Sequence, residues 1–151
     1  MNLEKTTALA AILRNERGGV LLQLRDNHAK FFPNTWSVIT GGMKPIDKTP
    51  EAGIRREIGR ELYALGKSLE PHNLRLFSDK YTYKDEQQDC RQYVYTGELY
   101  LPEEQRWLTL EDITLNEGQD IGIFTPEQIR SMHIGANYGQ ILEAVFQHEI
   151  H

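Results

Sequence analysis

GGMKPIDKTP, residues 41–50, is the most informative segment of the sequence, because it leads from an expected strand into a helix whose start is well defined. The two glycines allow the backbone to approach a ligand without hindrance from a Cβ atom. Thr49 can cap the first free amides of the helix, and Pro50 suits its first turn. We therefore predict a helix that begins at Thr49, continues to about residue 65 and stops at Gly66.

The expected helix carries an apolar stripe at helical spacing, formed by Ile54, Ile58, Leu62 and Leu65. It also carries Glu57 and Glu61, four residues apart, which places their Cβ atoms roughly 5–6 Å from each other on one face. Carboxylate oxygens so placed can share a magnesium ion. Taken alone, however, a glutamate pair with this spacing is more often a solvated helix face.

Outside this helix, the hydrophobic pattern predicts strands joined by polar turns, with two further helices near the C-terminus. The expected strands are Thr6–Leu13, Val20–Arg25, Trp36–Thr40, Leu74–Tyr83 and Arg91–Tyr100, with two short extended pieces between residues 108 and 125. The expected helices are Pro126–Met132 and Gly139–His148. This order of elements indicates the α/β class, a mixed sheet flanked by helices, in a single domain over residues 1–151.

Composition excludes several classes of protein. The 151 residues are 39% hydrophobic and 26% charged, which is the balance of a folded, soluble protein rather than a disordered or fibrous one. The formal net charge of −5 argues against a dedicated nucleic-acid-binding protein, which needs a basic face. The longest apolar run near the start is too short to span a membrane. Cys90 is the only cysteine, so we expect no intrachain disulfide and a cytoplasmic location.

The segment that begins at Gly42 resembles the Nudix box, the phosphate and metal motif of the MutT-like (Nudix) hydrolases. The family pattern is G-x5-E-x7-R-E-U-x-E-E-x-G-U, in which U is a bulky aliphatic residue. The sequence matches this pattern at Gly42, Arg56, Glu57, Ile58 and Glu61. It departs from the pattern at Lys48 and Arg60, where the family has glutamates, and at Tyr63, where the family has glycine.

The resemblance continues on both sides of the box, in residues 22–26, 34–36 and 115–119, and covers most of residues 5–145. It implies the Nudix fold, an α/β/α sandwich with a mixed, curved sheet flanked by helices. It also implies metal-dependent hydrolysis of a nucleoside diphosphate linked to another moiety, with Mg²⁺ or Mn²⁺ as the cofactor.

The same resemblance implies roles for individual residues. Glu57 and Glu61 would hold the metal and serve catalysis, and Glu117 would be a base or an additional ligand. Arg56 would organise the loop and the helix of the box. The residues expected along the phosphate path are Gly41, Gly42, Lys48 and Arg60.

Arg60 has three interpretations. It turns outward to solvent, or it pairs with Glu57 or Glu61 and silences the site, or its planar guanidinium replaces the metal by holding phosphate oxygens directly. Lys48 has a simpler alternative, because a lysine in a loop is commonly exposed to solvent. The two charge reversals therefore decide whether the expected site still performs hydrolysis.

The sequence leaves a second function open beside hydrolysis. A silenced Nudix module would bind a nucleotide or diphosphate without turnover, and a third, weaker interpretation is an interaction protein that uses the fold as a scaffold. In the first two cases we expect a small-molecule partner, with no nucleic acid and no membrane. The sequence does not decide between a monomer and a homodimer.

Overall fold

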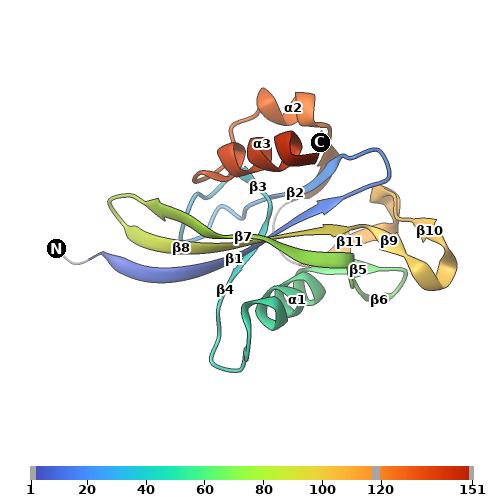
Figure 1. Cartoon of the computed structure of the whole chain (residues 1–151), viewed down its shortest axis with the longest axis horizontal. Helices are drawn as coiled ribbons and strands as arrows, with labels where there is room; N and C mark the ends of the chain where they lie inside the picture. Colours follow the sequence, from blue (N-terminus) through green and yellow to red (C-terminus); the bar gives the residue numbers. More distant parts are fainter. Residues whose placement is uncertain (1–2, 117–119, 150–151) are drawn as a thin grey trace.

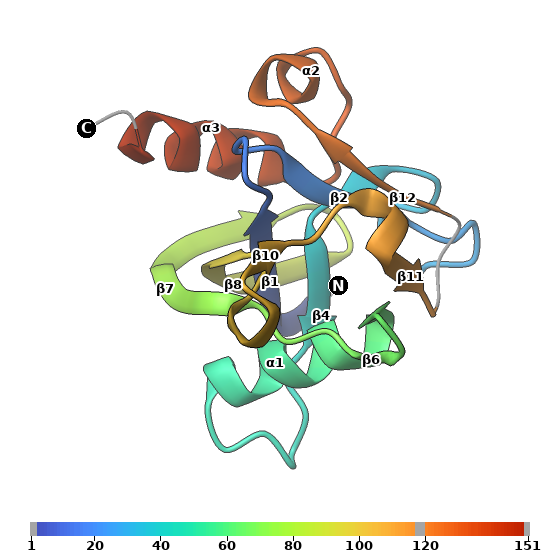
Figure 2. The ribbon, with the colours of Figure 1, turned by 90° about the vertical axis from the view of Figure 1, so that its right-hand side faces the viewer.

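The computed structural model describes residues 3–116 and 120–149 of the chain. One strongly curved sheet lies between helix α1 on one face and helices α2 and α3 on the other (Figure 1 and Figure 2). The expected sandwich with a mixed, curved sheet is therefore confirmed. Among the described residues, no helix combines the length and the apolar composition that crossing a bilayer requires.

The elements follow one another in an order close to the expected one. The helices are α1 Pro50–Glu61, α2 Pro126–Arg130 and α3 Tyr138–Glu149, with single 3₁₀ turns at Pro102–Glu104 and Leu110–Asp112. The strands are β1 Glu4–Arg14, β2 Val20–Leu24, β3 Trp36–Ser37, β4 Ile39–Gly42, β5 Leu62–Ala64, β6 Lys67–Ser68, β7 His72–Lys84, β8 Gln88–Glu98, β9 Tyr100–Leu101, β10 Arg106–Trp107, β11 Ile113–Leu115 and β12 Asp120–Phe124.

Strand β1 lies at the centre of the main sheet, whose strand order is β12-β2-β1-β8-β7. It pairs in parallel with β8 and antiparallel with β2 and β4, which makes the sheet mixed. Side chains along a strand alternate between its two faces. Leu9 and Leu13 accordingly pack into the core beneath α1, whereas Ala10 and Ile12 pack into the core beneath α3.

Helix α1 begins as the sequence predicts but ends earlier. The Thr49 hydroxyl accepts a hydrogen bond from the amide of Ala52, and Pro50 occupies the first turn. The helix stops at Glu61, so the predicted continuation to residue 65 is wrong.

The residues after Glu61 form strand β5 instead, which pairs with β11, a segment some fifty residues further along. Leu62 and Ala64 are buried and Tyr63 between them is exposed, which is the alternation of a half-buried strand. Leu65 and Gly66 then adopt positive φ angles of 52° and 80° and turn the chain into β6. Leu62 fits both the helical stripe and this strand, so its hydrophobicity alone does not distinguish them.

Strand β4 places Gly41 against the following helix, beside Glu57. Gly41 pairs with Leu9 of β1, and a Cβ atom on Gly41 would collide with the side chain of Glu57. Inside the helix, a Cβ on Gly53 would lie 2.5 Å from Leu9 Cδ1. Both glycines therefore allow α1 to pack closely against the sheet, and this packing fixes the position of Glu57.

Candidate functional site

A pocket of about 460 Å³ lies between β4, the C-terminal part of α1 and the loop after β2. Its lining includes two backbone glycines, three basic side chains and three acidic ones: Gly41, Gly42, Arg25, Lys44, Arg60, Asp26, Glu57 and Glu61. The structure thus brings together five of the residues that the sequence assigns to the site. Glu117, the expected base, lies outside the described residues.

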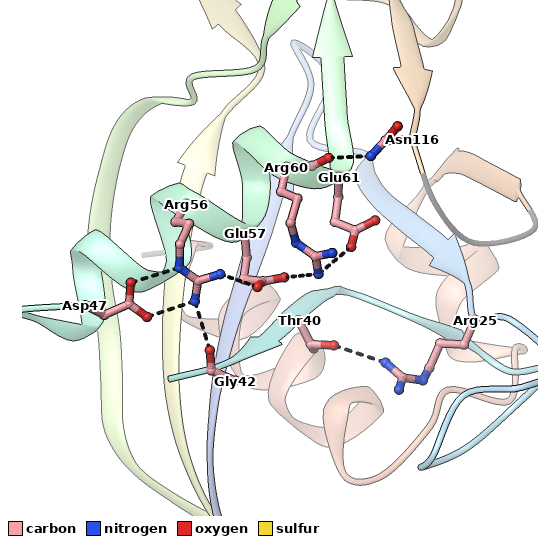
Figure 3. Close-up of polar contacts among 9 residues, drawn as sticks. All are labelled: Arg25, Thr40, Gly42, Asp47, Arg56, Glu57, Arg60, Glu61 and Asn116. Carbon is pink, nitrogen blue, oxygen red and sulfur yellow. Dashed lines mark hydrogen bonds and ion pairs between the residues drawn. The ribbon is translucent and has the colours of Figure 1, made fainter. Parts of the chain in front are cut away.

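Arg56 joins the loop of the box to the helix (Figure 3). Its guanidinium donates from Nε to Asp47 Oδ1 and from Nη2 to Asp47 Oδ2, each at 2.8 Å, and also from Nη2 to the carbonyl oxygen of Gly42 at 3.0 Å. Asp47 Oδ2 accepts a further hydrogen bond from the amide of Lys44 at 2.8 Å. We call this arrangement of Arg56, Asp47 and the Gly42 carbonyl the box clasp.

The hydrogen bonds of the clasp shift the pKa values of Asp47 and Arg56. The hydrogen bonds from the Arg56 side chain lower the pKa of Asp47 to about 2, and the Asp47 carboxylate raises the pKa of Arg56. Asp47 therefore pairs with Arg56 one position before Lys48, where the family pattern has a glutamate. Sequence reasoning missed it, because counting along the pattern led to Lys48.

Lys48 itself is exposed and is not part of the pocket lining. Lys44, four residues earlier, lines the pocket instead. A phosphate-binding role for Lys48 stays a prediction, and Lys44 is the better-placed lysine.

Arg60 turns toward the two box glutamates rather than outward (Figure 3). Its Nη2 lies 2.9 Å from Glu57 Oε2 and 3.0 Å from Glu61 Oε1. The other oxygen of Glu57, Oε1, accepts a hydrogen bond from Arg56 Nη1. The Glu57 carboxylate is thus held between two guanidinium groups, and its side chain is only 2% exposed.

These residues, as arranged, do not fit a divalent cation. Magnesium requires carboxylate oxygens with near-octahedral geometry and keeps several waters, whereas both oxygens of Glu57 are engaged by arginine. Within residues 3–116 and 120–149, no group of three or more His, Cys, Asp or Glu side chains could hold a metal. Metal binding by Glu57 and Glu61 stays a prediction, and it requires Arg60 to move away.

A second pocket, of about 280 Å³, adjoins the first, because Arg25, Thr40, Gly41 and Gly42 line both. The rest of its lining is neutral and partly aromatic, and includes Phe31, Phe32, Tyr83, Gln88, Cys90, Gln92 and Tyr138. Burial raises the pKa of Tyr138 to about 12, so its hydroxyl is neutral at physiological pH. The buried Cys90 thiol is part of this wall, on strand β8.

Arg25 stands where the two pockets meet. Its Nε donates to the carbonyl oxygen of Phe31 at 2.9 Å, and its Nη1 donates to Thr40 Oγ1 at 3.2 Å. Burial lowers the pKa of this guanidinium, which nevertheless remains charged at neutral pH. In the sequence, Arg25 belongs to residues 22–26, which resemble the family, but the resemblance does not assign it a role.

Two loops form the rim of the second pocket. Phe32 and Ala136 line it, and both have positive φ angles, 51° and 52° respectively, that residues with a Cβ atom rarely adopt. The loops also touch, since a Cβ atom on Gly135 would lie 3.0 Å from Thr35 Oγ1 and 3.2 Å from Phe32 Cβ. Below the rim, Gln92 and Asn137 exchange two side-chain hydrogen bonds of 2.7 and 3.0 Å.

The fold is shared with solved structures of low sequence identity. The MutT protein of Methanosarcina mazei Go1 is 18% identical, with a TM-score of 0.71 over 99% of this chain and 97% of that one. The NUDIX domain of Shewanella oneidensis NrtR, solved with ADP ribose, is 14% identical, with a TM-score of 0.70 over 98% and 89%. A bifunctional NMN adenylyltransferase/ADP ribose pyrophosphatase from Francisella tularensis is 14% identical, with a TM-score of 0.67 over 97% of this chain and 42% of that one.

No curated protein sequence matches the chain. The family model described as NUDIX domain, however, matches residues 4–136, which include the box, the clasp and most of both pockets. The chain therefore belongs to the Nudix family.

Proposed function

We propose that the chain binds a nucleoside diphosphate, free or linked to another moiety, in the two joined pockets, and that Arg60 suppresses its hydrolysis. The observation that carries this proposal is the contact of one guanidinium with both box carboxylates, at 2.9 and 3.0 Å. The function that the sequence offers as its alternative thus becomes the leading one.

The two pockets suit the two halves of such a ligand. The second pocket, which we call the neutral pocket, offers aromatic side chains and a few buried polar groups. This is the usual composition of a site for an organic ring system. The first pocket, which we call the charged pocket, offers guanidinium and ammonium groups together with the Gly41–Gly42 backbone. The NUDIX domain of NrtR, which shares the fold, was solved with ADP ribose, a compound with both halves.

Suppression follows from the electrostatics of a divalent cation beside Arg60. Hydrolysis of a diphosphate needs the cation to neutralise phosphate oxygens and to prepare the attacking water. Two unit charges about 4 Å apart repel by at most about 4 kcal/mol at an effective dielectric of 20, and twice that for a divalent ion. Solvent screens part of this, because the Arg60 side chain is 45% exposed. The remaining repulsion still lowers cation affinity by orders of magnitude.

Metal-dependent hydrolysis at a reduced rate is the second candidate. It is favoured by the retained frame, in which the clasp is intact and Glu57 and Glu61 share a helix face. The partial exposure of Arg60 gives its side chain room to leave the glutamates when Mg²⁺ or Mn²⁺ arrives. In this candidate Glu117 is the proposed base.

One assay separates the two candidates. Wild type, Glu57→Gln, Arg60→Glu and the double variant Arg60→Glu/Glu57→Gln are incubated with a panel of nucleoside diphosphates and ADP ribose, in Mg²⁺ and in Mn²⁺. Released phosphate and nucleoside monophosphate are measured. We expect wild type to be stabilised thermally by a panel member without cleaving it. We expect Arg60→Glu to cleave it, and the double variant to lose that cleavage. Turnover by wild type that Glu57→Gln abolishes would establish the second candidate instead.

The remaining expectations about partners stay predictions. A cytoplasmic location and the absence of a nucleic-acid partner rest on composition and on the net charge of −5. A homodimer also stays a prediction. Light scattering, which measures the molar mass in solution, tests it.

A further inference from the structure

We infer that the charged pocket binds diphosphate without a divalent cation, because the Arg60 guanidinium takes the place of the metal as the positive charge that faces the ligand. This inference rests on the proposed binding function and adds to it the mode of phosphate recognition. It departs from the metal-assisted binding that the family resemblance implies.

The first step is that Arg60 covers the anionic groups of the box. The side chains of Glu57 and Glu61 are 2% and 8% exposed, whereas that of Arg60 is 45% exposed. Glu57 also packs so closely on Gly41 that no Cβ atom fits between them. A ligand that enters the pocket therefore meets the guanidinium, while the two carboxylates beneath it are withdrawn from solvent and neutralised.

The second step is that other cations line the same pocket from different segments. Arg25 directly follows β2, and Lys44 comes from the loop between β4 and α1. Hydrogen bonds to Phe31 and Thr40 hold the Arg25 side chain in place, so this cation is positioned before any ligand binds. Asp26 is the acidic residue of the lining that is exposed, and it lies at the loop side of the pocket.

The third step concerns the chemistry of the donors. A guanidinium presents several N–H groups in a planar fork that matches two phosphate oxygens, and charge-assisted hydrogen bonds of this kind are about twice as strong as neutral ones. Arg25, Arg60 and Lys44 together supply donors along a pocket that shares Arg25, Thr40 and the two glycines with the neutral pocket. A diphosphate attached to a nucleoside fits this sequence of donors.

A consequence distinguishes this mode from metal-assisted binding. In the metal-assisted mode, added Mg²⁺ strengthens ligand binding. Here Mg²⁺ competes with Arg60 for Glu57 and Glu61 and with the protein for the diphosphate, so it leaves the affinity unchanged or weakens it.

Isothermal titration calorimetry tests the inference with inorganic pyrophosphate, ADP, GDP, CDP, UDP and ADP ribose as probes, in EDTA and then in excess Mg²⁺. We expect at least one probe to bind in EDTA, with no gain in Mg²⁺. We expect Arg60→Ala to weaken that binding by about tenfold or more, since a charge-assisted contact is lost, and Arg60→Lys to restore part of it. The matched control is Arg55→Ala on the same helix, because Arg55 is equally exposed at 45%, pairs with Glu51 and lies outside the pocket.

The outcomes separate this inference from the proposed function. Binding that requires Mg²⁺, or binding in EDTA that Arg60→Ala leaves unchanged, overturns the inference and leaves binding without turnover intact. No binding of any probe in either condition overturns both. Hydrolysis by wild type in Mg²⁺, together with cation-free binding through Arg60, overturns the suppression of hydrolysis and supports the inference. Thermal melting of each variant confirms that it is folded.

Discussion

Arg56 and Arg60 lie one turn apart on the same helix and both contact Glu57, yet they do different things. Arg56 is 24% exposed and ties the helix to Asp47 and to the backbone of the preceding strand. Arg60 is 45% exposed, reaches Glu57 and Glu61, and faces the pocket. The clasp that shapes the loop is therefore separate from the side chain that sets the charge of the pocket. The charge at position 60 of the box is reversed, whereas the contacts of Arg56 with Asp47 and Gly42 are retained.

Removal of Arg56 should have the largest effect on stability. We expect Arg56→Ala to lower the melting temperature by about 6 °C or more, because the nearly buried Glu57 loses one of its guanidinium partners and the loop loses its anchor. Arg60→Ala should cost less, because Glu57 keeps Arg56 and the loop keeps its anchor, and because the half-exposed Arg60 side chain is partly solvated. Differential scanning calorimetry of both variants measures the difference, and equal losses would mean that the two arginines are structurally equivalent.

Replacement of Arg60 by an acidic residue should create a cation site. Saturating Mn²⁺ should raise the melting temperature of Arg60→Glu, by an amount that corresponds to about 2.7 kcal/mol at a hundredfold excess over the dissociation constant. Wild type should show little change, because its carboxylates are engaged by arginine. A comparable Mn²⁺ shift in wild type would show that the cation displaces Arg60 readily.

The third prediction acts on Glu57, the partner that the two arginines share. Gly41→Ala should destabilise the fold by about 1–3 kcal/mol, since the new methyl group overlaps the Glu57 side chain and must push it away from both arginines. The control is Gly42→Ala, where a Cβ atom meets nothing within 4 Å and the change should stay within about 0.5 kcal/mol. Urea unfolding of the two variants measures both. A harmless Gly41→Ala would contradict the close packing.

The fourth and smallest effect is the pH dependence of the clasp. The pKa of Asp47 is about 2 in the fold against an ordinary value of 3.8, so the unfolded chain takes up a proton first as the pH falls. The stability from this group is complete above about pH 4 and is lost as the pH falls toward 2. Urea unfolding between these pH values should show that the free energy of unfolding falls less steeply with decreasing pH in Arg56→Ala than in wild type. Identical slopes would mean that Asp47 draws its low pKa from elsewhere.

The sequence predicted the features that depend on neighbouring residues. Thr49 and Pro50 define the start of α1 through local hydrogen bonding and a fixed φ angle, so this boundary was predictable. Strand β1 was predictable as well, because its apolar run is long enough to fill both faces of a central strand. The end of α1 was not, because strand β5 forms only when the distant β11 pairs with it.

The site was predictable as a set of residues but not as an arrangement. The resemblance assigned Glu57, Glu61 and Arg60 to one place, and all three line the same pocket. The direction of Arg60 depends on a rotamer that spacing along the helix does not determine. The roles of Asp47 and Arg25 depend on how the loops fold back onto the helix and the sheet, and so on contacts between residues that are far apart along the chain.

The rim of the neutral pocket has a consequence for affinity. Left-handed backbone at Phe32 and Ala136 is unfavourable in isolation and persists only where the surrounding packing leaves the chain no alternative. The two loops, which already touch through Gly135, are therefore shaped before a ligand arrives. A preorganised rim spares the ligand the entropy of ordering those loops, so that modest contacts inside the pocket can yield useful binding.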